Sequence, residues 1–143
     1  MIKSKITRID IFPAQIPLSE PFVISKGALT HARTTIIRIY SDQGLYGTGE
    51  CCPFRSIHAE TQAGTVAIAK DLAAALLGED PAEISKHIQT LNSMFVGKAS
   101  VKGAFDMALY DLTAKTLEMP LYRYLGGHRD KTIVADNTKK KKE

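Results

Sequence analysis

Apolar residues between Ala99 and Gly127 recur with the spacing of an α-helix. They lie three or four positions apart and form one wide stripe, the pattern of a helix with a single buried face. Pro120 lacks the N–H that this helix would need, but it suits the first turn of a new helix, which we expect over Leu121 to Leu125. Gly126 or Gly127 then supplies a left-handed cap. The stripe consists of Val101, Ala104, Phe105, Ala108, Leu109 and Leu112.

Two further helices are predicted earlier in the chain. From Glu60 to Gly78 the apolar residues again follow a helical period. The next helix is expected to begin within Asp80-Pro81-Ala82-Glu83, because Asp80 can accept a hydrogen bond from a free N–H and Glu83 can reach back in a capping box. Its apolar stripe reaches Phe95 and ends at Gly97.

The first fifty residues are predicted to form strands. Ile6 to Gln15 is rich in Ile and Phe, and Pro13 and Pro17 either end its pairing or place it at a sheet edge. Ser19 to Thr30 is expected to be a loop, because it contains Pro21 and Gly27 and few periodic apolar residues.

A hairpin should follow this loop. Arg33 to Tyr40 is strongly β-forming, residues 41–44 have the composition of a turn, and Leu45 to Glu50 returns. Gly47 and Gly49 weaken the returning strand, which indicates that another backbone or a ligand comes close there.

The order of elements predicts the fold class. Three strands followed by about three helices give an α+β domain, in which a three-stranded antiparallel sheet is followed by a helical bundle packed on one of its faces. No internal repeat or linker divides the chain. With 143 residues and 44% hydrophobic content, the chain is long enough for one domain with a core.

Charge and hydropathy exclude two classes of partner. The formal net charge is +4, but the terminal run Lys139 to Glu143 supplies four basic residues and one acidic residue, so the remainder has 15 basic and 14 acidic residues, or +1. A nearly neutral globule lacks the basic face that nucleic-acid binding needs. No apolar run approaches the roughly 18 residues of a membrane span, and the first residues lack a signal-peptide core. We therefore expect a cytoplasmic protein.

Several side chains could carry chemistry, but each has a simpler structural interpretation. The adjacent Cys51 and Cys52 bridge only with strain and lack histidine at zinc-ligand spacing, so reduced thiols on a loop are expected. His87 is expected on a helix surface. Gly103 lies inside a helix, where glycine costs about 1 kcal/mol relative to alanine, so close backbone packing is expected there.

Charged pairs are expected along the last long helix. Lys102 and Asp106 are four residues apart, as are Asp111 and Lys115, and such pairs can meet along a helix surface. The two aspartates do not share a helix face, so they are not expected to act as an acid/base pair.

Two ordered motifs resemble one known family. The first is Ala104-Phe-Asp-Met-Ala-Leu-Tyr-Asp-Leu-Thr-Ala-Lys115, followed by Met119-Pro-Leu-Tyr122 and Leu125-Gly-Gly127; the second is Gly44-Leu-Tyr-Gly-Thr-Gly-Glu50. Together they resemble the N-terminal capping domain of the enolase superfamily, in its mandelate racemase and muconate lactonising branch. Dipeptide epimerases are the most similar members, and the similar residues are Pro21-Phe22, Thr30-His31-Ala32, Cys52-Pro53-Phe54 and Ile57.

The resemblance implies a division of the chain and of the chemistry. Residues 1–130 are expected to form the capping domain, and residues 131–143 the start of a first barrel strand with a disordered lysine-rich tail. Enzymes of this family abstract a proton α to a carboxylate, with Mg²⁺ and lysines that belong to the barrel. We therefore assign no catalytic residue and no metal ligand here. The chain alone is predicted to be inactive, and its expected partner is its own barrel or a second copy.

The resemblance also implies a lid that selects a dipeptide or another small carboxylate. Its two loops are expected at Phe22 to Thr30 and at Cys51 to Glu60. The candidate substrate-facing residues are Ile24, Lys26, Phe54, Ile57 and His58, with Thr138 at the end of the first barrel strand. Alternatively, Phe22, Phe54 and Ile57 pack the loops onto the sheet.

The side chain of the substrate and the function of the domain each have two interpretations. Some dipeptide epimerases have an arginine for an acidic side chain where this chain aligns Gly27; its absence argues against an Ala-Glu substrate, although Lys26 could substitute. A non-catalytic α+β binding or assembly domain is the alternative function. A downstream reading frame that encodes barrel ligands would favour the lid, and a natural stop after Glu143 would favour the alternative.

Overall fold

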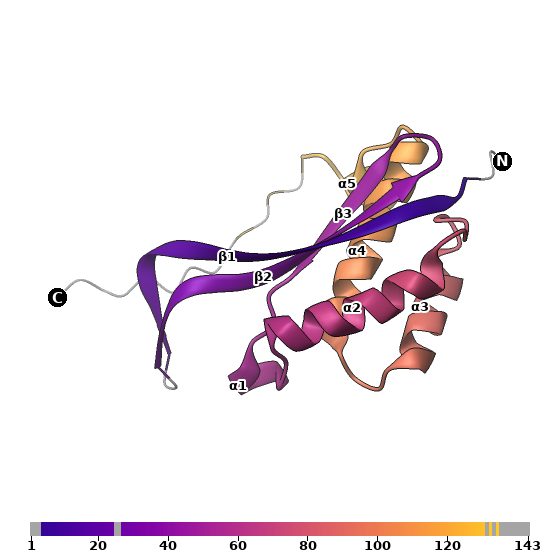
Figure 1. Ribbon diagram of the computed structural model, residues 1–143. Coiled ribbons are helices and arrows are strands. Elements are labelled where there is room, and N and C mark those ends of the chain that lie inside the picture. Colours follow the sequence, from indigo (N-terminus) through magenta and orange to yellow (C-terminus); the bar gives the residue numbers. More distant parts are fainter. Residues whose placement is uncertain (1–3, 25–26, 131, 133, 135–143) are drawn as a thin grey trace.

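The computed structural model describes residues 4–24, 27–130, 132 and 134. The three strands form one antiparallel sheet in the order β1-β2-β3. They span Ile6–Ile24 (β1), Gly27–Ser41 (β2) and Tyr46–Cys51 (β3). The helices are α1 (Arg55–His58), α2 (Gln62–Leu76), α3 (Ile84–Met94), α4 (Ala99–Thr116) and α5 (Leu121–Tyr124). Figure 1 shows the β1–β2 ribbon extending beyond the helices, with its outer part on the side of α1.

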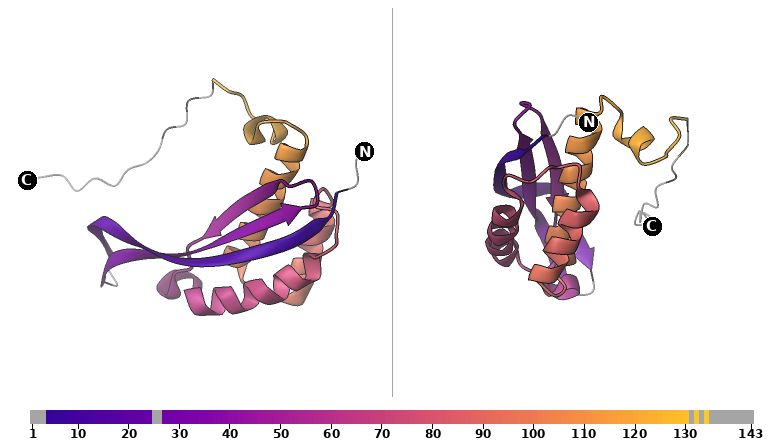
Figure 2. Two further views of the ribbon diagram at one scale, coloured as in Figure 1. Left: turned by 45° about the horizontal axis from the view of Figure 1, so that its top comes forward. Right: turned by 90° about the vertical axis from the view of Figure 1, so that its right-hand side faces the viewer.

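One hydrophobic core joins the sheet to the helices. Ile37 and Ile39 of β2 are fully buried in a cluster that also contains Leu72 of α2 and Phe105 and Leu109 of α4. Alternation of buried and partly exposed residues along β2 means that the helices cover one face of the sheet. Figure 2 shows α2 and α4 lying along the sheet in two further views. The predicted α+β class and three-stranded sheet are confirmed.

The glycines of β3 fit the predicted close approach. A Cβ on Gly47 would overlap the carbonyl oxygen of Ala108, and a Cβ on Gly49 would overlap the carbonyl oxygen of Ala104. The backbone of α4 therefore lies directly on β3. The prediction for Gly103 is wrong, because a Cβ there would meet nothing within 4 Å. Its position in a helix suggested packing, but that face of α4 is open.

The loop predicted at Ser19 to Thr30 is wrong over most of its length. β1 continues to Ile24 and pairs with β2 as far as Ile24 with Gly27, after a register shift between Pro17 and Phe22. Pro13 and Pro17 are tolerated because β1 is an edge strand, so their missing N–H groups break no second ladder. The sequence Phe22-Val-Ile24 has high β-propensity and supports the extension.

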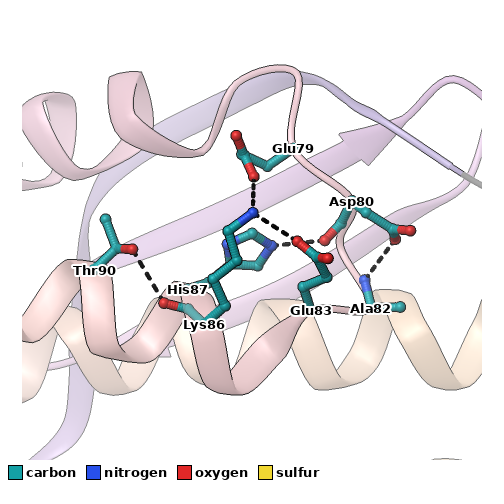
Figure 3. Close-up of polar contacts among 7 residues, drawn as sticks. All are labelled: Glu79, Asp80, Ala82, Glu83, Lys86, His87 and Thr90. Carbon is teal, nitrogen blue, oxygen red and sulfur yellow. Dashed lines mark hydrogen bonds and ion pairs between the residues drawn. The ribbon is translucent and has the colours of Figure 1, made fainter.

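The start of α3 also differs from the prediction. The Asp80 carboxylate accepts a hydrogen bond from the N–H of Ala82 (3.0 Å), and the helix begins only at Ile84. The Glu83 carboxylate does not close a capping box, because it pairs with Lys86 (2.7 Å), which also contacts Glu79 (2.6 Å; Figure 3). The hydrogen bond from Lys86 holds the pKa of the Glu79 carboxyl below its usual value.

His87 is not a surface residue. Its side chain is 1% exposed, and Nε2 donates a hydrogen bond to the backbone carbonyl of Asp80 at 2.6 Å (Figure 3). The turn that precedes α3 directs this carbonyl toward the helix, so the buried imidazole satisfies a partly buried acceptor.

One of the two predicted pairs on α4 forms. Asp111 and Lys115 lie 2.8 Å apart, and the Asp111 carboxylate also accepts the N–H of Thr48 in β3. The Lys102–Asp106 pair is wrong, because Lys102 donates instead to Asn92 (3.0 Å) and to the carbonyl of Phe95 (2.6 Å). Burial raises the pKa of the Asp106 carboxyl.

The cysteines are both free, as predicted, but only Cys52 lies outside regular structure. Cys51 ends β3 and is buried, and burial raises the pKa of its thiol to about 11.

Pro120 precedes α5, and Gly126 takes a positive φ of 75°, which agrees with the predicted cap. No helix in the part of the chain that the structure describes is long and apolar enough to cross a membrane. The predicted barrel strand and lysine tail fall almost entirely outside the described residues.

Candidate functional site

The two segments predicted to form the lid border one groove of about 690 Å³. One wall is the outer part of the β1–β2 ribbon, and the other is the segment that follows β3. Figure 1 shows α1 beside this part of the ribbon. The groove is lined by Leu18, Phe22, Ala28, Leu29, Thr30, His31, Ala32, Arg33, Cys52, Pro53, Phe54, Arg55, Thr61 and Gln62.

Local backbone structure positions the wall after β3. Pro53 is buried, and Phe54 is extended and begins the single helical turn of α1. Ala59 takes a left-handed conformation that ends this turn. The hydroxyl of Thr61 then accepts the N–H of Gly64 at 3.2 Å and caps α2.

Hydrogen bonds attach this wall to the sheet. Nε2 of Gln62 donates to the carbonyl oxygens of Ala14 (2.8 Å) and Thr34 (2.6 Å). The Thr34 hydroxyl lies 2.9 Å from the carbonyl oxygen of Cys51, and Sγ of Cys52 lies 3.6 Å from that of Arg33. The two walls are therefore held in one arrangement by contacts from β1, β2 and α2.

The structure brings some of the predicted residues together. Phe54 lines the groove and is half-buried, and Phe22 faces the same groove from β1 with 59% of its surface exposed. Ile57 is 69% exposed, and His58 is also exposed; both belong to α1 and neither lines the groove.

Of the three remaining predicted residues, one ends a strand and two lie outside the described part of the chain. Ile24 is the last residue of β1. Lys26 and Thr138 lie outside the described residues. The roles of the six candidate residues in substrate contact stay predictions.

Sequence reasoning did not single out the arginines and the glutamine of the groove. Arg33 belongs to a predicted strand and Arg55 to a predicted loop, and only the pairing of β2 with β3 places them at one groove. The role of Gln62 could not be predicted from its neighbours in sequence, because its two hydrogen bonds go to backbone carbonyls 48 and 28 residues earlier.

The described residues offer no metal centre. In the range covered by the structure, no group of three or more His, Cys, Asp or Glu side chains could hold a metal ion. The Mg²⁺ that the family resemblance implies therefore does not fit these residues, and no chemical step is assigned to it here.

Comparison with known proteins places this geometry in a family. Residues 6–126 match the family described as "Mandelate racemase / muconate lactonizing enzyme, N-terminal domain". The chain is 39% identical over 133 residues to the D-Ala-D/L-Ala epimerase of Cytophaga hutchinsonii, which covers 93% of this chain and 36% of the relative. It is 33% identical to the hydrophobic dipeptide epimerase of Enterococcus faecalis, covering 94% of this chain and 38% of the relative.

A solved structure agrees with the sequence comparison. The dipeptide epimerase of Cytophaga hutchinsonii, crystallised with Mg and the dipeptide D-Ala-L-Val, matches with a TM-score of 0.86 and 38% identity. The match covers 89% of this chain and 34% of that structure. The chain thus spans slightly more than a third of the length of the two curated relatives. It belongs to the mandelate racemase and muconate lactonizing enzyme family of the enolase superfamily, and it corresponds to the N-terminal domain of that family's dipeptide epimerases.

Proposed function

We propose that residues 1–130 form the substrate-selecting lid of a racemase or epimerase that acts on dipeptides or related small carboxylates. The observation that carries the proposal is the groove, because two segments about thirty residues apart in sequence converge there and leave aromatic side chains exposed. Phe22 and Phe54 supply apolar surface that is not consumed by the core. The epimerase of Cytophaga hutchinsonii, crystallised with Mg and the dipeptide D-Ala-L-Val, supports the substrate class.

The chemistry of such a reaction explains why a lid is useful. Removing a proton from carbon beside a carboxylate creates an enolate with two negative charges, and preorganised groups stabilise that charge far better when water is excluded. In this proposal the described residues bind and enclose the substrate. The base, the acid and the Mg²⁺ lie on a barrel outside the described residues, either in the same polypeptide or in a partner. A cytoplasmic location stays a prediction.

Complementation tests the proposal. The chain, the remaining barrel part of the Cytophaga hutchinsonii epimerase, and their mixture are each incubated with Mg²⁺ and dipeptides in deuterated water. We expect α-proton exchange only in the mixture, because neither part holds both the lid and the proton-transfer groups. Phe54→Ala should weaken exchange, whereas Leu77→Ala, at an exposed residue outside the groove, should not.

Two outcomes would contradict the proposal. Exchange by the chain alone, surviving metal chelation, would place the chemistry in this chain and not in a barrel. A mixture that forms a stable complex but exchanges no dipeptide or N-acylamino acid would favour a non-catalytic binding or assembly domain.

A further inference from the structure

The groove has an uneven charge. Among the described residues that line it are two arginines and one histidine, but no aspartate or glutamate. Arg33 comes from β2, and Arg55 is the first residue of α1, on the opposite wall. The beginning of α2 also borders the groove at Thr61 and Gln62, and its helix dipole adds partial positive charge there. The ionisable side chains that line the groove among the described residues are therefore cationic or neutral, and they favour an anion over a cation.

The two arginines are unpaired within the described part of the chain. Several other cations of the domain have partners: Arg8 pairs with Asp10 at 3.3 Å, and Lys86 and Lys115 pair with carboxylates. The guanidinium groups of Arg33 and Arg55 form neither an ion pair nor a hydrogen bond with any described residue. Their ten N–H donors are thus available to a ligand.

The surroundings make these donors more selective than arginines on an open surface. An isolated surface arginine is fully solvated and gains little from pairing. Here Leu18, Phe22 and Phe54 line the same groove, so a ligand that covers them removes water from its neighbourhood. A planar guanidinium binds a carboxylate through two parallel hydrogen bonds, which a neutral amide cannot match.

We infer that Arg33 and Arg55 select a substrate that bears a second carboxylate, such as a dipeptide with an acidic side chain or an acyl amino acid with a diacid chain. This inference rests on the proposed function and narrows its substrate class. Family membership does not decide the point, because the two relatives described above are named for different side chains. The absence of arginine at Gly27 does not exclude an acidic side chain, because the groove supplies arginines from other positions.

A matched pair of ligands tests the inference on the intact chain. L-Ala-L-Glu and L-Ala-L-Gln have nearly the same shape and the same backbone charges, and differ only in the side-chain carboxylate. Each is titrated into ¹⁵N-labelled chain while amide chemical shifts are followed. We expect the amide signals of groove residues to shift. The glutamate dipeptide should bind about tenfold more tightly than the glutamine dipeptide, because a charge-assisted hydrogen bond contributes about that much.

Variants show whether the arginines cause the preference. Arg33→Gln and Arg55→Gln should each reduce binding of L-Ala-L-Glu by about tenfold and leave L-Ala-L-Gln unchanged. Arg123→Gln is the control, because this exposed arginine lies on α5 outside the groove. All three spectra should stay native, since none of these guanidinium groups has a partner within the described residues.

The outcomes separate this inference from the proposed function. Equal binding of the two dipeptides, no binding of either, or a preference that survives both arginine substitutions would overturn the inference, while exchange in the complementation experiment could still occur. An arginine-dependent preference for the glutamate dipeptide would support the inference even if no barrel mixture exchanged its α-proton, and the proposed function would then fail alone.

Discussion

Gly49→Val is expected to destabilise the domain by about 3 kcal/mol or more, the upper end of the usual cost of overpacking a core. Any Cβ at this position overlaps the backbone carbonyl of Ala104, and a backbone group within a buried helix cannot rotate away as a side chain can. β3 and α4 would have to separate, which would open the core around Phe105. Urea unfolding followed by circular dichroism measures the change in the free energy of unfolding.

Gly103→Ala is the control, because it adds a Cβ to a glycine of α4, whereas Gly49→Val adds a Cβ and two methyl groups on β3. A Cβ at Gly103 meets nothing within 4 Å, so alanine should stabilise α4 by roughly 0.5–1 kcal/mol through its higher helix propensity. A Gly49→Val variant as stable as the parent, or a Gly103→Ala variant that loses stability, would show that α4 does not lie on β3 as described.

Phe105→Ala is expected to cost about 3–5 kcal/mol, because the side chain is fully buried between the sheet and the helices. Phe22→Ala should change the free energy of unfolding by about 0.5 kcal/mol or less, because this ring is largely exposed beside the groove. The same denaturation experiment measures both.

The pair of phenylalanines also tests the alternative that Phe22 merely packs a loop onto the sheet. In that case its removal would cost an amount comparable to Phe105. If Phe22 faces the ligand, we expect Phe22→Ala to change the free energy of unfolding only slightly and to weaken dipeptide binding.

The sequence predicted those features that depend on neighbouring residues. The stripe of α4 follows from spacing within one helix, and Gly47 and Gly49 stood out because glycine is unfavourable in a strand. The features that it missed depend on contacts with distant segments. β1 extends to Ile24 because β2 pairs with it and leaves its prolines at an edge.

His87 shows the same limit at one side chain. The position of His87 in the helical pattern of α3 does not reveal its hydrogen-bond partner. The loop before the helix directs the carbonyl of Asp80 toward the imidazole. The lid segments were predicted from a family resemblance, and the structure adds the arginines that the resemblance did not indicate. Arg33 and Arg55 are 22 positions apart, so only the folded sheet reveals that they share a groove.

Transplanting the domain shows whether these residues select the substrate. Residues 1–130 replace the N-terminal domain of the Cytophaga hutchinsonii epimerase, and kcat/KM is measured for a panel of dipeptides with small, apolar, neutral polar and acidic side chains. We expect an active chimera whose order of preference among the dipeptides differs from that of the parent and shifts toward acidic side chains. A folded chimera that keeps the parent's order of preference would contradict this expectation, because selection would then reside in the barrel.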